Sequence, residues 1–163
     1  MTINTWINAF LKPKETFAAE KANASIGKGA INYLIAGVIS GIFSFLMTLV
    51  LSNVVLSKYP ANLVTANPIT LITTPIGAIF FSFIWIGILF VFAKILGGKG
   101  SFSSLYYLAS LPAVILALLG WVPILGILVA LYGLYLLFLA IKESQEISSG
   151  KAASVILIPL AIL

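Results

Sequence analysis

Long apolar runs constrain this chain more than any other feature of its sequence. Apart from Lys94, close to the end of the second run, they carry no charged side chain, and they lie at about 30–56, 76–95, 102–119 and 124–141. About 20 apolar residues in a helix cross a bilayer, and backbone groups in lipid must find partners within their own segment. The runs therefore predict an all-α, polytopic membrane helix bundle with four full spans.

The composition agrees with lipid as the main solvent. The 163 residues are 61% hydrophobic and 8% charged, whereas soluble domains carry about 25% charged residues. The net charge of +5 results from nine lysines and four glutamates, with no arginine. Because arginine usually reads guanine edges and stacks on single strands, a chain without arginine is not expected to bind nucleic acid. The absence of cysteine excludes disulfides and thiolate chemistry.

A fifth apolar segment, residues 152–163, ends the sequence. As a helix it would be roughly 18 Å long, which is too short to cross a bilayer. It is either a half-span buried among the others or a fifth span of which the sequence holds only the first part. We expect the second.

Residues 1–29 form a separate segment, and residues 30–163 the transmembrane domain. The apolar side chains of residues 3–10 share one helical face, and Pro13 ends this short helix before a more charged one. We expect both helices to lie at the membrane interface, although a solvated cytosolic tail is the alternative. The expected interfacial anchors are Trp6, Phe10, Lys12 and Lys14.

The lysines predict the orientation. If the N-terminus is cytosolic, eight of the nine lysines lie on that side, and only Lys58 lies on the other. Lysine-rich short loops stay in the cytosol. We therefore expect a cytosolic N-terminus, an outside C-terminus, and contact with anionic lipid headgroups.

Small residues form stripes on the first and fourth predicted spans. Such stripes let membrane helices approach closely. We expect packing within the chain, either stripe against stripe or both against a third helix; a seam between two copies is the alternative. The stripe residues are Gly37, Gly41, Ser44 and Thr48 on the first span, and Gly126, Ala130 and Gly133 on the fourth.

The stretch 95–112 joins the second and third spans through a glycine-rich hairpin. Its sequence lacks the P-loop pattern, so we interpret it as a flexible hairpin, with a cradle for a lipid phosphate as the alternative. Pro112 should kink the third span. The residues expected to contact a partner or lipid here are Gly97, Gly98, Lys99, Gly100, Tyr106, Tyr107 and Pro112.

The residue types that carry catalysis are scarce. The spans hold no ionisable side chain except Lys94, the chain has no histidine, and its four carboxylates lie in the expected interfacial segments. Proton relays, hydrolytic dyads and metal centres need such groups. Glu143 and Glu146 are better interpreted as a solvated helix end than as a site. We expect no enzyme activity, no cofactor and no metal.

Several stretches together resemble a known family. They are Trp6 with KPKETF at 12–17, LGGKGSFSSLYYLASLP at 96–112, the GWVP turn at 120–123, LYGLYLLFLAIKES at 131–144 and SGKAASVILIPL at 149–160. The chain is similar to a prokaryotic, archaeal member of the Yip (Ypt-interacting protein) domain family. The resemblance implies five membrane helices, a cytosolic N-terminus and an outside C-terminus.

The resemblance also implies a function. Eukaryotic Yip proteins are associated with Golgi membrane traffic, Rab-type GTPases and membrane shaping. This sequence lacks their long N-terminal region and its Asp-Leu-Tyr-Gly-Pro motif, so a GTPase partner is not expected. We expect a membrane scaffold that binds lipid, another membrane protein or a second copy of itself. The alternative is a small passive transporter or channel for a neutral or apolar solute.

Overall fold

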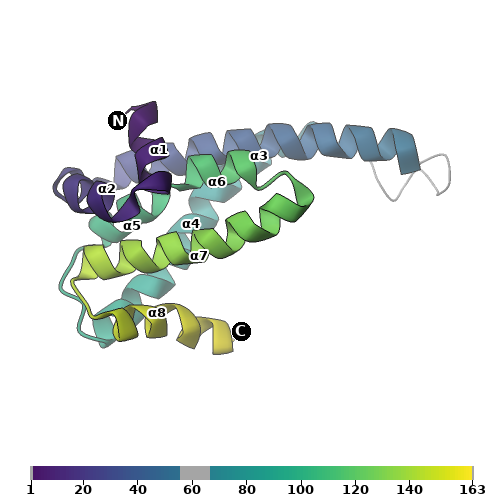
Figure 1. The fold of residues 1–163 in the computed structure, drawn as a ribbon. Coiled ribbons are helices and arrows are strands. Elements are labelled where there is room, and N and C mark those ends of the chain that lie inside the picture. Colours follow the sequence, from purple (N-terminus) through teal and green to yellow (C-terminus); the bar gives the residue numbers. More distant parts are fainter. Residues whose placement is uncertain (1, 56–66, 163) are drawn as a thin grey trace.

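The computed structural model describes residues 2–55 and 67–162, and this part of the chain contains helices and no strand. Four of its segments are long and apolar enough to cross a membrane: Ile26–Leu51, Thr70–Ile95, Phe102–Leu119 and Leu125–Gln145. This confirms an all-α fold with four membrane-crossing segments (Figure 1). The helices are α1 (Ile3–Leu11), α2 (Pro13–Glu20), the 3-10 turn η1 (Lys21–Asn23), α3 (Ile26–Val55), α4 (Thr70–Ile95), α5 (Phe102–Ser110), α6 (Ala113–Leu119), α7 (Pro123–Gln145) and α8 (Ser149–Ile162).

Two helix starts differ from the sequence prediction. The first long helix begins at Ile26 and includes Lys28, so the expected boundary after residue 29 falls inside α3. The second begins at Thr70. The Asn67 Oδ1 accepts a hydrogen bond from the Ile69 N–H, and this bond fixes the turn that precedes the helix. Pro75 lies inside α4 and is buried. The polar loop expected around Lys58 falls outside the described residues.

Proline divides the third span as predicted. The helix stops at Ser110 and resumes at Ala113, with Pro112 as the N-terminal cap of α6. Pro123 then lies in the first turn of α7. Its lack of an N–H group loses no hydrogen bond there, because N–H groups in the first turn have no acceptor within the helix. The short link between α6 and α7 brings the two helices back against each other.

The last turn is tighter than its charged sequence indicated. Helix α7 continues through Gln145, and α8 starts at Ser149, so only three residues connect them. Glu146 ends α7 with φ of 55°, in the left-handed region. Glu143 and Glu146 therefore do not share a helical face.

Helix α5 lies at the centre of the molecule. Four consecutive side chains are essentially inaccessible, with exposed fractions of 0–1%: Leu105, Tyr106, Tyr107 and Leu108. Tyr106 belongs to a cluster with residues of α4, α7 and α8, while Tyr107 packs with residues of α1, α2 and α7. A helix buried on several faces holds both halves of the fold together.

The two small-residue stripes contact different helices. A Cβ added at Gly37 would lie 2.6 Å from the Pro75 Cα, and one at Gly41 would lie 3.3 Å from the Thr70 carbonyl oxygen, so the first stripe packs on α4. Gly133 instead faces Leu116 of α6. Gly37 and Gly41 therefore face α4, whereas Gly133 faces α6, and these glycines do not meet one another.

Candidate functional site

Lysines gather at one end of the bundle. Figure 1 shows α2, the start of α3, the hairpin after α4 and the α7–α8 turn side by side at the left of the view. We call this surface the lysine-rich end. It carries Lys14, Lys21, Lys28, Lys94, Lys99, Lys142 and Lys151, and Lys14 and Lys142 line one small hollow there.

An ion pair ties the N-terminal helices to this end. The Lys21 Nζ lies 2.7 Å from the Glu146 Oε1, across 125 residues of sequence. The hydrogen bond and the positive charge of Lys21, together with the charge of Lys99, hold the pKa of Glu146 below its ordinary value. Glu146 stays exposed, with 58% of its side chain accessible. The pair is therefore a surface contact that sets geometry more than stability.

The glycine hairpin is packed against the end of α7. Gly97 has φ of 90°, which favours glycine. A Cβ on Gly100 would collide with the Ser144 carbonyl oxygen, and one on Gly98 would lie 2.9 Å from the Ala93 carbonyl oxygen. The hairpin glycines therefore serve close packing.

The hairpin amides already have acceptors. Gly97 donates to the Lys94 carbonyl, Gly98 to the Ala93 carbonyl and Lys99 to the Gln145 carbonyl, at 2.8–3.0 Å. These three amides are not available to a lipid phosphate, so they do not support a phosphate cradle. The Lys99 side chain remains exposed, so the ammonium group is what this hairpin offers to a ligand.

A buried polar chain positions α1. The Trp6 indole N–H donates to the Asn32 Oδ1 at 2.9 Å, and the Asn32 Nδ2 donates to the Ser110 Oγ at 2.9 Å. Ser110 in turn donates to the Tyr107 carbonyl. Asn32 and Ser110 are both fully buried. Breaking such a bond in an apolar surrounding is costly, because a buried polar group without a partner has lost its hydration and gained no hydrogen bond in return.

Helix α1 has its aromatic face turned the opposite way from our expectation. Trp6 contacts Asn32, and the Phe10 ring lies 5.0 Å from the Tyr132 ring, edge to face. Both predicted lipid anchors therefore dock on the protein. The large apolar side chains left exposed on α1 are Ile3, Ile7 and Leu11.

Three further residues of the expected contact surface are buried. Tyr106 and Tyr107 are 0% and 1% exposed, and Pro112 is buried beside them. The Tyr107 hydroxyl donates to the Glu20 Oε2 at 2.7 Å, which fixes α2. These residues cannot contact a partner. Their role is to hold the elements that carry the lysines.

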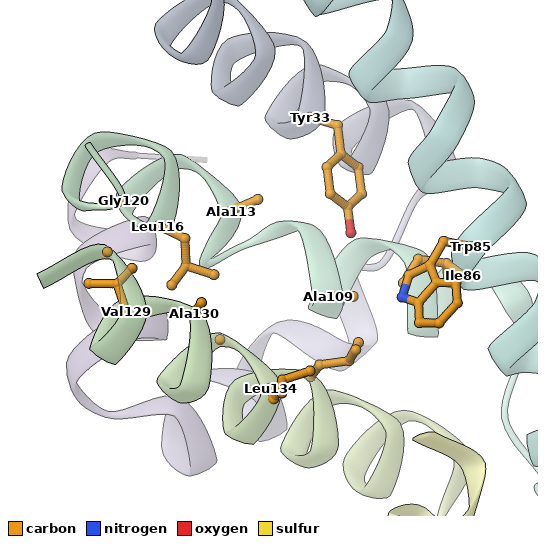
Figure 2. Close-up of a pocket in the computed structure, with 13 residues that line it drawn as sticks. Tyr33, Trp85, Ile86, Ala109, Ala113, Leu116, Gly120, Val129, Ala130 and Leu134 are labelled. Atoms are coloured by element: carbon orange, nitrogen blue, oxygen red, sulfur yellow. The ribbon is translucent and has the colours of Figure 1, made fainter. Parts of the chain in front are cut away.

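A cavity of about 470 Å³ lies within the bundle, away from the lysine-rich end (Figure 2). Residues of α3, α4, α5, α6 and α7 line it, including Tyr33, Trp85 and Gly133. Its position was not predicted. The structural roles of three polar residues were also not predicted: Asn32, Gln145 and Glu146. The partner of a single polar residue in or beside an apolar run can be identified only once the fold is known.

A bundle with four helices long and apolar enough to cross a bilayer defines a multi-pass integral membrane protein. The family model of the Yip1 domain matches residues 7–163. The chain therefore belongs to the Yip1 domain family. No curated protein and no solved structure matches it.

Proposed function

We propose that the protein is a membrane scaffold of the Yip type that organises lipid and partners at the cytosolic surface. The observation that carries this proposal is the convergence of lysines from four separate stretches on one end of the bundle. Positive loops remain cytosolic, so this end faces the cytosol and the opposite end faces outside. The scaffold would bring together other membrane proteins or further copies of this chain.

Anionic lipid headgroups are the first partner of this surface. A juxtamembrane lysine contributes about 1 kcal/mol near an anionic leaflet, and salt screens it over a Debye length of about 10 Å at 0.1 M. Because these lysines are held on helices and short turns, their binding free energies add up without the entropic cost of ordering a flexible tail. Exposed Ile3, Ile7 and Leu11 on α1 add an apolar contact at the same leaflet.

Lipid selectivity of the full-length protein tests the proposal. In vesicles that contain spin-labelled phosphatidylglycerol or phosphatidylcholine, the wild type should immobilise the anionic lipid preferentially, and salt should reduce this preference. A triple variant of the lysine-rich end, Lys14→Gln, Lys99→Gln and Lys151→Gln, removes three exposed charges and should lose much of this preference. Lys58→Gln is the matched control. Equal selectivity of the triple variant and the wild type would refute the lipid role.

The second candidate, passive transport of a neutral or apolar solute, has less support. A polar passage lined by Ser44, Thr48, Ser82 or Ser110 would favour it, and none of these residues lines the 470 Å³ cavity. Three of the four hydroxyls donate to carbonyls of their own helices instead. Solute flux through vesicles that contain the protein would decide for transport.

A further inference from the structure

The 470 Å³ cavity has the size and lining of a ligand site. Small-molecule sites typically enclose about 300–1,000 Å³, with apolar walls and a few placed polar groups. Here the walls are mostly alanine, leucine, isoleucine and glycine from α4 to α7. The lining of α7 runs from Gly126 to Leu137, which corresponds to roughly 17 Å along the helix axis. The cavity is therefore long enough for a stretch of hydrocarbon chain.

Two hydrogen-bond donors serve this cavity without a protein partner. Figure 2 shows the Tyr33 hydroxyl pointing into the open space, with the Trp85 indole nitrogen facing the same region. In the described part of the chain, neither group makes a hydrogen bond, although nearby Tyr106 bonds to Ser82 at 3.1 Å. A donor left unpaired in an apolar surrounding is costly. An occupant with an acceptor oxygen would remove that cost.

The cavity opens toward lipid. Leu134 lines it and is 45% exposed, and Ala130, also in the lining, is exposed beside it. The neighbouring α7 residues Leu128 and Leu131 are 60% exposed. All of them belong to a membrane-crossing segment. An entrance with an apolar rim at this depth admits hydrocarbon from the bilayer.

The lining also specifies the charge of the occupant. No lysine or glutamate lines the cavity, so an ionised carboxylate or amine would lack a counter-charge there. A neutral acceptor, such as the ester carbonyl or ether oxygen of a glycerolipid, satisfies both donors. We propose that this cavity binds one hydrocarbon chain of a membrane glycerolipid, with the glycerol-linked oxygen of that chain at Tyr33 and Trp85.

Native mass spectrometry of the full-length protein in detergent tests this site. The probes are phosphatidylcholine with ester-linked chains and its ether-linked analogue. The wild type should retain one molecule of lipid. Ala113→Phe, which fills the cavity, should abolish retention, whereas Val91→Phe, at a 56% exposed position of α4 outside the lining, should not change it.

The donors are tested by variants that remove the donor group. Tyr33→Phe removes only a hydroxyl, and the loss of one hydrogen bond should weaken retention about three- to tenfold for the probe whose oxygen accepts it. Trp85→Phe should act in the same direction. Unchanged retention of both probes in Tyr33→Phe and Trp85→Phe, or retention of detergent and no phospholipid by the wild type, would overturn the proposal.

Discussion

Gly100 marks the closest approach between the hairpin and α7, because any side chain there meets the Ser144 carbonyl. Gly100→Ala should lower the free energy of unfolding by about 1–3 kcal/mol, the usual cost of overpacking. Gly150→Ala is the matched control, since a Cβ there meets nothing within 4 Å. Unfolding in mixed detergent micelles would measure both. Similar stabilities of the two variants would show that the hairpin can move away from α7.

Asn32 is a single residue that joins two helices to α3. Asn32→Leu leaves the Trp6 indole without its acceptor, and an unsatisfied buried group costs about 1–3 kcal/mol. We expect faster hydrogen exchange in α1 (Ile3–Leu11), with little change in α8. Asn8→Leu, at an exposed position of α1, is the control. Unchanged exchange of α1 in Asn32→Leu would mean that Phe10 and Tyr132 suffice to hold it.

At the scale of elements, the seam between α3 and α4 depends on small residues. Gly41→Leu should disrupt the bundle, because its Cβ already lies 3.3 Å from the Thr70 carbonyl oxygen and 3.4 Å from the Thr74 Cβ. Ile42→Leu, at a position 46% exposed, should be tolerated. Thermal unfolding in detergent would compare the variants. If Gly41→Leu is as stable as Ile42→Leu, the two helices do not pack along this stripe.

The tie between η1 and the α7–α8 turn should respond to acid. Lys21 lowers the pKa of Glu146. The ionised carboxylate therefore stabilises the contact with Lys21 fully at pH values above its ordinary pKa of 4.5. This stabilisation is lost as the pH falls through the lowered pKa. Spin labels at Ala18 and Ser148 should then report a longer separation. Glu146→Gln should show the longer separation at neutral pH, and Glu15→Gln should not.

Local features of the sequence predicted much of this fold. Contacts between residues that are distant in the sequence could not be predicted. Pro13 and Pro112 act on their own backbone, so both helix breaks could be foreseen. The lengths of the spans follow from bilayer thickness. In contrast, the face of α1 that meets the protein depends on Asn32 and Tyr132, which are 26 and 122 residues from their partners. The positions of the lysines can be read from the sequence, but the pairing of Lys21 with Glu146 could not be foreseen.

At the scale of the whole molecule, the orientation of the bundle is the central expectation. Single cysteines introduced at Ser25, Ser101 and Ser148, in a chain that has none, should react with an impermeant thiol reagent from the cytosolic side only. Asn62→Cys, outside the described residues, should react from the opposite side, because the lysine distribution predicts it. Labelling of all four positions from one side would refute the expected topology.

The central position of α5 has a consequence for biosynthesis. Phe102–Leu119, to which α5 belongs, is the least apolar of the four membrane-crossing segments and the most buried. A segment leaving the translocon with Ser104, Tyr106 and Tyr107 uncovered would expose polar groups to lipid. Since α7 follows it in the chain, the third segment has to be retained beside α3 and α4 until α7 emerges. We therefore expect membrane integration of this protein to be a cooperative step that involves several helices.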